Sequence, residues 1–274
     1  MYPTVTLVNK SSYSEAIKQI GGIENLNESN REVVIKVGIY NPETKICTTV
    51  ETLNSIISEF NKSQKIRIVE SDSGAGPGLE RLEIWRNCFN ENIKPFNLSN
   101  DTQTKDVTVA GENVPLSNIL FGNRTFVSTH VPRRYEGTGD EDLMNLGSII
   151  KNLLGLIPDK KKFRFHNRLP KTLLDLYEAI GGIDLAILDC SNVFLGRKSE
   201  RLMVPLDLLV VGKDAFAVEA VGASLVGFNP LEMTVLQEAY SRELGEINLK
   251  KINVIGDLKT PKSLIAKSFN DLAN

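Results

Sequence analysis

Lys151 and Asn152 interrupt an otherwise apolar run near the middle of the chain. A basic cluster at 159–162 follows, and then comes His166, one of only two histidines. An amine can neutralise anionic oxygens, and an imidazole of ordinary pKa can transfer a proton near neutral pH. The segment therefore predicts a site with Lys151 and His166 as catalytic residues and Asn152 as a ligand-binding residue. The alternatives are an exposed helix edge for the Lys-Asn pair and a solvated turn for the basic cluster.

Lys36 stands near the end of the apolar run Glu32–Gly38. Such a run is typical of a strand covered on both faces in a parallel sheet. Open α/β sheets bind ligands at the carboxyl ends of their strands, so Lys36 is a candidate to neutralise an anionic ligand. The alternative is an edge residue whose ammonium extends to water. Thr48 and Thr49 precede an apolar helical pattern at 50–60, which a Thr can cap, and they are further ligand-binding candidates.

Asp189 ends a second apolar run, 183–190, which predicts a buried strand. A carboxylate at the carboxyl end of such a strand is the third catalytic candidate, either orienting His166 or holding a divalent ion. A polar loop is expected to follow at 192–201.

Three glycines lie in the segment Ser71–Gly78, between a predicted strand and a helical pattern. Their backbone N–H groups could form a nest for phosphate or carboxylate, with Ser73, Gly74 and Gly76 as ligand-binding candidates. The alternative is a flexible connection. Neither a GxGxxG nor a Walker A pattern matches this spacing.

His130, Arg133 and Arg134 lie where the predicted strand 125–131 runs out into a loop. They are candidates for an arginine clamp on an anionic ligand. A solvated basic turn is the alternative.

The elements that must position these residues indicate an α/β fold. Strand, helix and strand alternate over 32–70, the pattern of a βαβ unit. We predict a mainly parallel or mixed sheet with helices on both faces, in a single domain over 1–274 with a β-rich polar insertion around 90–145. Asp214 is expected to cap a helix over 215–226, and Glu219 inside that helix requires a partner.

Composition narrows the classes of function. The 274 residues include 32 basic and 34 acidic side chains, which gives a net charge of −2. The chain therefore lacks the overall positive charge that drives non-specific binding to nucleic acids, and we expect no nucleic-acid partner.

The cysteines indicate no metal site. Cys47, Cys88 and Cys190 are far apart and match no CxxC metal pattern, which favours reduced thiols. A carboxylate-rich magnesium site with Asp72 and Asp189 stays open. The chain has neither a secretory signal nor a membrane-spanning run, so we expect a soluble cytoplasmic protein that does not bind membranes.

Several segments together resemble the family described as domain of unknown function 362 (DUF362). The resemblance rests on Val33-Val-Ile-Lys36 followed by Thr48-Thr49, on Ile150-Lys-Asn-Leu-Leu-Gly-Leu-Ile-Pro158 with His166 downstream, on Leu188-Asp189, and on Val211-Gly-Lys-Asp-Ala-Phe-Ala-Val-Glu-Ala-Val221 with Leu225-Val-Gly227. It extends from about Val33 to Asp257 and implies the α/β fold. Some members carry a ferredoxin-like cysteine cluster, for which this chain has no ligands. The chain also departs from the family pattern at Ser128–Arg134 and at Glu219.

Two functional hypotheses follow. The first is an enzyme that binds a small anionic molecule or cofactor in a cleft at the carboxyl ends of the strands. The alternative is a non-catalytic accessory or interaction protein for a redox or metal-centre system. The sequence points to no particular cofactor, substrate or oligomeric state.

Overall fold

The computed structural model describes residues 2–44, 46–136, 149–197 and 200–272. Two compact units make up the chain. Unit 1 contains 1–22, 130–151 and 185–274, and unit 2 contains 23–129 and 152–184. The single domain over 1–274, with its insertion at 90–145, stays a prediction, and residues 137–145 of that insertion lie outside the described part.

Four parallel strands form the sheet of unit 2. Their order is β7 (Arg124–His130), β2 (Glu32–Val37), β3 (Ile66–Glu70) and β4 (Ile93–Asn97). Residues 33–37 are all buried, as the apolar run predicts for an inner parallel strand. The helix α2 (Val50–Glu59) connects β2 to β3, which confirms the predicted strand-helix-strand unit. Lys36 and Glu70 thereby occupy the carboxyl ends of two neighbouring strands.

The remaining elements of unit 2 are helical segments and one hairpin. After β3 come α3 (Gly78–Leu82) and a 3₁₀ helix, Glu83–Cys88, and after β4 come the paired strands β5 (Thr104–Val109) and β6 (Glu112–Ser117). The apolar run that Lys151 and Asn152 interrupt contains a 3₁₀ helix, Lys151–Leu156. A second 3₁₀ helix, Lys162–Arg168, and α5 (Leu169–Ala179) follow it.

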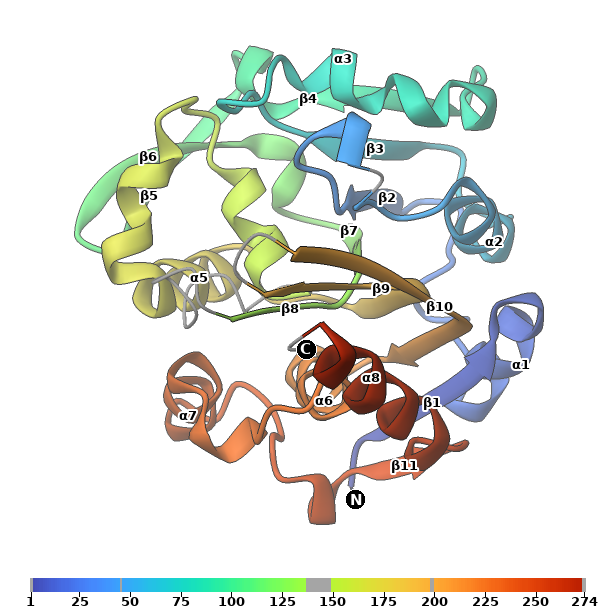
Figure 1. Cartoon of the computed structure of the whole chain (residues 1–274). Coiled ribbons are helices and arrows are strands. Elements are labelled where there is room, and N and C mark those ends of the chain that lie inside the picture. The colour runs from blue at the N-terminus through green and yellow to red at the C-terminus, as the bar shows by residue number, and fades with distance from the viewer. Residues whose placement is uncertain (1, 45, 137–148, 198–199, 273–274) are drawn as a thin grey trace. The chain divides into compact units, whose positions relative to one another are not determined.

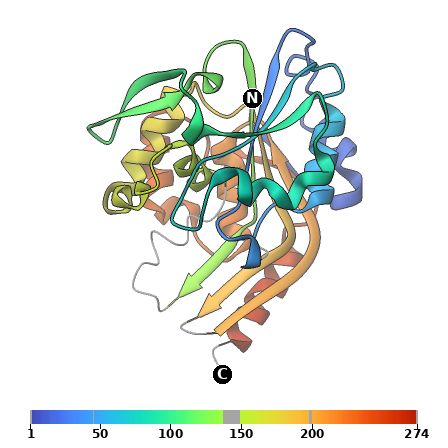
Figure 2. The ribbon, with the colours of Figure 1, turned by 90° about the horizontal axis from the view of Figure 1, so that it is seen from above.

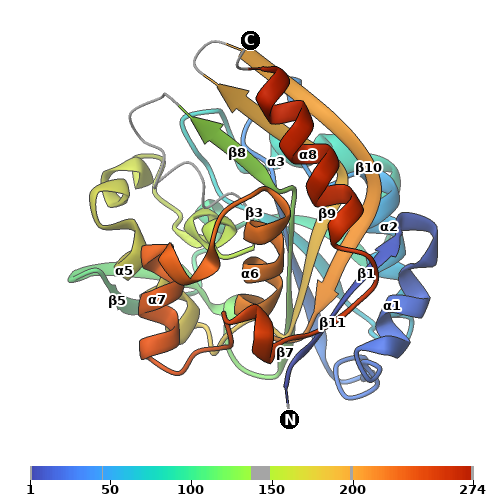
Figure 3. The ribbon, with the colours of Figure 1, turned by 60° about the horizontal axis from the view of Figure 1, so that its bottom comes forward.

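The sheet of unit 1 is mixed (Figure 1). β1 (Thr4–Asn9) pairs parallel with β11 (Asn253–Ile255) and antiparallel with β10 (Glu200–Gly212), which pairs antiparallel with β9 (Leu185–Arg197). Among the described residues of unit 1, the α-helices are α1 (Tyr13–Gln19), α6 (Ala215–Leu225), α7 (Thr234–Ser241) and α8 (Lys259–Asp271). Figure 3 shows α8 lying along the β9–β10 hairpin. The predicted α/β class with a mixed sheet is confirmed.

The β9–β10 hairpin corrects two predictions. The polar loop expected at 192–201 is wrong, because β9 continues to Arg197 and β10 begins at Glu200. Val193 and Leu195 are buried, which gives this part of β9 enough apolar contact to remain a strand. Asp189 is therefore in the interior of β9 and not at its carboxyl end. β8 (Arg133–Glu136) pairs parallel with the last residues of β9, and Figure 2 shows it beside the far end of the hairpin.

Two local predictions in unit 1 concern α6. The Asp214 carboxylate accepts hydrogen bonds from Phe216 N and Ala217 N at 3.0 Å, so it caps the helix as expected. Glu219 is buried and accepts from Ile149 N at 2.8 Å and Ile150 N at 3.1 Å, which supplies the partner that its burial requires. Among the helices of the described residues, none has the length and apolar character needed to cross a membrane.

Candidate functional site

Lys36 is the centre of a buried polar cluster in unit 2. Only 1 % of its surface is exposed, and its ammonium donates to three acceptors: Val37 O at 2.8 Å, Asn152 Oδ1 at 2.9 Å and Glu70 Oε2 at 3.0 Å. The interpretation of Lys36 as an edge lysine that reaches water is therefore wrong. All three ammonium protons have an acceptor, as a buried charge requires.

Asn152 links Lys36 on β2 to the neighbouring strand β7. Its amide nitrogen donates to Lys36 O at 2.9 Å, Ser128 Oγ at 3.1 Å and Thr129 O at 3.2 Å, while its oxygen accepts from the Lys36 ammonium. Both ends of the amide are thus used inside the unit. The apolar run around Asn152 predicts a site residue there, and the structure brings Asn152 and Lys36 together.

Gly155 completes the contact between the 3₁₀ helix Lys151–Leu156 and the cluster. A Cβ at this position would lie 2.6 Å from Lys36 Cε and 2.9 Å from Glu70 Oε1, distances that real side chains do not show. The Gly155 carbonyl accepts a hydrogen bond of 2.7 Å from Ser71 Oγ. In the Lys-Asn-Leu-x-Gly segment, the Asn and the Gly therefore both contact the Lys36 cluster.

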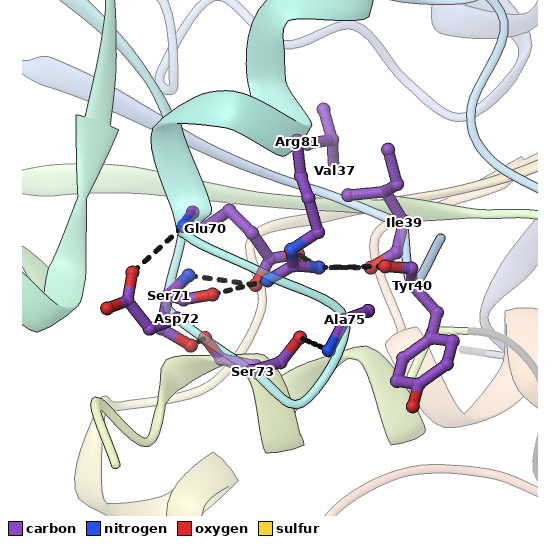
Figure 4. A network of polar contacts seen from close by, with 12 residues as sticks. Val37, Ile39, Tyr40, Glu70, Ser71, Asp72, Ser73, Ala75 and Arg81 are labelled. Atoms are coloured by element: carbon purple, nitrogen blue, oxygen red, sulfur yellow. Dashed lines mark hydrogen bonds and ion pairs between the residues drawn. The ribbon is translucent and has the colours of Figure 1, made fainter. Parts of the chain in front are cut away.

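Arg81 is a second buried cation on the same carboxylate. Its Nη1 lies 3.5 Å from Glu70 Oε2 and donates to Ile39 O at 3.0 Å, while its Nη2 donates to Ser71 O. Figure 4 shows the guanidinium between Glu70 and the backbone of Ile39 and Tyr40. The side chain is 3 % exposed, so this cation is held by protein acceptors and not by water.

Lys162 brings a third cation to the cluster. Its ammonium donates to Ser71 Oγ, and the residue is 8 % exposed. The solvated turn expected at 159–162 is therefore wrong for Lys162, although Lys160 and Lys161 are exposed. Three buried cations, Lys36, Arg81 and Lys162, thus lie around Ser71 and the Glu70 carboxylate.

Burial, together with the neighbouring charges, changes the pKa of the two lysines. Burial lowers the pKa of Lys162 from 10.5 to about 8; the Glu70 carboxylate opposes this shift, and the charges of Lys36 and Arg81 add to it. Burial also lowers the pKa of Lys36, against the attraction of Glu70. Lys162 is therefore an amine that can gain and lose a proton close to physiological pH.

The free energy of unfolding should depend on pH through Lys162. Between pH 8 and 10.5 the unfolded chain keeps this proton while the folded chain loses it, so stability rises with pH across that window and the contribution is flat below it. The measurement is urea unfolding of the wild type and Lys162→Met at several pH values. The variant should show a weaker rise. Equal slopes for the two proteins would contradict the lowered pKa.

The two threonines have structural partners in unit 2. Thr48 Oγ1 donates to Thr129 O at 3.3 Å, and Thr49 accepts from Thr52 N at 3.2 Å as the cap of α2. The capping prediction is confirmed for Thr49, while ligand binding by both residues stays a prediction.

The Ser71–Gly78 loop uses most of its amides internally. Two backbone hydrogen bonds join Ser73 and Gly76: Ser73 N donates to Gly76 O at 3.0 Å, and Gly76 N donates to Ser73 O at 3.1 Å. Ala75 N donates to Ser73 Oγ. Gly78 N donates to Asp72 Oδ1 at 2.9 Å. An anion bound by these amides would have to displace acceptors already in place. The anion nest at Ser73, Gly74 and Gly76 stays a prediction.

The three predicted catalytic residues lie on different elements. His166 is half-buried on the 3₁₀ helix Lys162–Arg168 of unit 2, and Lys151 is half-buried in unit 1. Asp189 is completely buried within β9 of unit 1, where its Oδ1 accepts from Ser191 N at 3.0 Å. Their catalytic roles stay predictions.

The three residues of the predicted anion clamp differ in their contacts. Arg134 pairs with Glu136, donates to Val226 O and stacks 3.9 Å from the centre of the Phe269 ring. His130 is buried, and its Nε2 lies 3.0 Å from Arg133 Nη2. His130 and Arg133 are thus brought together, whereas Arg134 faces other groups of unit 1.

Sequence reasoning missed four members of the unit 2 cluster: Glu70, Ser71, Arg81 and Lys162. Glu70 could have been predicted as a site residue, because it ends the strand next to the one that carries Lys36. Lys162 had none, since it is the last of three identical side chains. Among the described residues, no group of three or more His, Cys, Asp or Glu side chains could hold a metal ion. Asp72 instead accepts from Gly78 and Asn97 and pairs with Lys160 at 3.6 Å.

Comparison with known proteins gives the family. None of the curated proteins matches the chain. Among solved structures, the lactate racemase apoprotein from Thermoanaerobacterium thermosaccharolyticum is similar, with a TM-score of 0.47 and 12 % sequence identity. The match covers 82 % of this chain and 57 % of that protein. A likeness of this size gives no information on function. The model of the family described as domain of unknown function (DUF362) matches residues 33–224, well over half of the sequence. The chain therefore belongs to the DUF362 family.

Proposed function

We propose that this chain is an enzyme that binds a small anionic molecule at the carboxyl ends of β2 and β3 in unit 2. The observation that carries the proposal is the charge of the buried cluster. Lys36, Arg81 and Lys162 surround one buried carboxylate, Glu70. Asp72 is half-buried and pairs with the exposed Lys160. A ligand of one or two negative charges would balance the cluster and lower the cost of burying it.

Lys162 is the group that meets the ligand in this proposal. The Lys36 ammonium already has three acceptors and the residue is 1 % exposed. Lys162 is 8 % exposed, and within the described residues its ammonium makes one hydrogen bond, to Ser71 Oγ. Its lowered pKa suits an amine that binds an anion when protonated and accepts a proton when neutral. In this proposal Lys36 and Asn152 hold the cluster in position, and the charge of Lys36 contributes to its positive potential.

The other predicted site residues enter as separate proposals. His166 lies on the same 3₁₀ helix as Lys162 and could share proton transfer with it. Lys151 and Asp189 belong to unit 1, and each requires its own test. If ligand binding survives both Lys151→Ala and His166→Ala, these two residues do not belong to the site.

Calorimetric titration tests the proposal, with inorganic phosphate and malonate as probes. Lys162→Met should weaken binding at least about tenfold, because a charge-assisted hydrogen bond contributes about 1.5–3 kcal/mol. Wild-type binding should also weaken as pH rises through about 8, where Lys162 loses its proton.

Lys161→Met is the matched control, since this neighbouring lysine is exposed. Its affinity should equal that of the wild type. Binding that is unchanged in Lys162→Met, or that does not vary with pH across this range, would rule out Lys162 as the ligand-binding group.

A second candidate is an accessory protein that docks a partner over the same segments of unit 2. Three large apolar side chains favour it: Tyr40 after β2, Leu79 in α3 and Phe163 beside Lys162 are 61, 42 and 66 % exposed. Figure 4 shows the Tyr40 ring pointing away from the polar network. Isolation from the native host of one stoichiometric partner, lost on Phe163→Ser, would favour this candidate.

A further inference from the structure

Lys162 and Lys36 differ in how many of their ammonium protons have an acceptor. The Lys36 ammonium donates to three protein oxygens, so all of its protons are used. Within the described residues, the Lys162 ammonium donates to one oxygen, Ser71 Oγ, although the residue is only 8 % exposed. A buried ammonium with one acceptor is costly, whereas a nitrogen that carries a single N–H would have its donor satisfied.

The hydroxyl of Ser71 determines the direction of this hydrogen bond. It donates its own proton to Gly155 O at 2.7 Å, and it therefore accepts from Lys162 Nζ. The lone pair of an unprotonated Lys162 is thus not used by the hydroxyl proton. Burial lowers the pKa of Lys162 to about 8, against the attraction of Glu70, so part of the population is unprotonated near physiological pH. A desolvated amine beside other cations is a nucleophile.

The charges around Lys162 would be balanced by one anion on its nitrogen. Lys36 and Arg81 both pair with the carboxylate of Glu70. Among these four groups the cations exceed the anion by two when Lys162 is protonated, and by one when it is neutral. The Nε of Arg81 is also buried without an acceptor among the described residues. A negative charge on Lys162 would make cations and anions equal in number and lower the cost of burying them.

We propose that Lys162 is a site of reversible carboxylation by carbon dioxide, and that the carbamate formed there regulates the anion site of unit 2. The Nζ lone pair forms a bond to the carbon of carbon dioxide, one C–O π pair moves onto an oxygen, and a nitrogen proton passes to water. The carbamate carries one negative charge and one N–H, which match the excess of cations and the single acceptor, Ser71 Oγ. Protonation of the nitrogen reverses the step and releases carbon dioxide.

Carbon dioxide suits this position because it is small and uncharged. It does not have to pay for the transfer of a charge into a buried cluster, and it does not need a wide opening to reach a residue that is 8 % exposed. The carboxylation itself requires no other ligand. Its regulatory role rests on the proposed function, because it requires that Lys162 also bind the anionic ligand. A carbamate places a carboxylate where that ligand needs an ammonium, so half occupancy should raise the apparent Kd about twofold.

NMR of the full chain tests for the covalent bond, with ¹⁵N-labelled lysine in the protein and ¹³C-bicarbonate as the source of carbon dioxide. A carbamate carbon is coupled through one bond to the lysine nitrogen, which bicarbonate bound without a covalent bond cannot show. We expect one coupled signal that grows at constant carbon dioxide pressure as pH rises through about 8. Lys162→Met should lose the signal. Lys161→Met, at the exposed neighbour, should keep it. No coupled signal in the wild type, or a signal that persists in Lys162→Met, overturns the carboxylation.

Calorimetric titration with inorganic phosphate, with and without bicarbonate, tests the regulation. Lys162→Arg keeps a cation, but a guanidinium does not form a carbamate, so bicarbonate should weaken its phosphate binding through competition alone. The wild type should lose more affinity than this variant, and equal losses overturn the regulatory role. A coupled signal in a chain that does not bind phosphate supports the carboxylation and contradicts the proposed function. Phosphate binding without a coupled signal supports the proposed function and overturns the carboxylation.

Discussion

Replacing Lys36 by methionine should lower the free energy of unfolding by about 3–5 kcal/mol, the largest loss that we expect from a single substitution in this chain. The change removes the ammonium 3.0 Å from Glu70 and leaves Arg81, at 3.5 Å, as the remaining ion-pair partner of a carboxylate that is 3 % exposed. It also removes the donor to Val37 O and to Asn152 Oδ1. Urea unfolding at neutral pH measures the loss.

Lys65→Met is the matched control. Lys65 also lies 3.0 Å from a glutamate, Glu32, but it is 50 % exposed, so its ion pair is screened by water. Its loss should be below about 1 kcal/mol. Comparable losses in the two variants would mean that burial does not increase the contribution of the Lys36–Glu70 ion pair to the free energy of unfolding.

Gly155→Ala should be the second large effect, with a loss of about 1–3 kcal/mol from overpacking. The added methyl group would lie 2.6 Å from Lys36 Cε and 2.8 Å from Nζ, and both groups are held by the hydrogen bonds of a buried ammonium. Either the 3₁₀ helix shifts or the contact between Lys36 and Glu70 lengthens. Chemical unfolding gives the size of the loss.

Gly74→Ala provides the comparison, because a methyl group there meets no atom within 4 Å and the glycine does not have a positive φ. It should change stability by less than about 0.5 kcal/mol. A Gly155→Ala variant as stable as Gly74→Ala would contradict the close packing of the 3₁₀ helix on Lys36.

The sequence predicted β2, β3 and β7 from their mostly apolar runs, but it assigned the segment of β4 to a β-rich polar insertion and not to this sheet. It located Lys36 and Asn152 because a polar side chain inside an apolar run is costly unless it has partners, and these partners exist. A polar residue within an apolar run indicates that its own side chain is buried and needs a hydrogen-bond partner. The run does not indicate which residue, distant in sequence, supplies that partner.

Lys162 and Asp189 illustrate the limit. Lys162 is indistinguishable in sequence from its exposed neighbours, and its burial depends on Ser71, 91 residues away. Asp189 seemed to end a strand because Ser191 and Asn192 are polar, yet β9 continues through both. Pairing with β10 supplies hydrogen bonds that a local pattern does not contain.

Unit 2 consists of two separate stretches of chain, 23–129 and 152–184, and this has a consequence for folding during synthesis. Asn152 Oδ1 and Ser71 bind partners contributed by the other stretch, and Lys36 lies 116 residues from Asn152. While the ribosome is still making the second stretch, Lys36 has no Asn152 acceptor and Glu70 has no Gly155 surface to pack against. The four-stranded sheet therefore lacks these contacts until the 3₁₀ helix has been synthesised, and contacts of such long sequence separation form slowly.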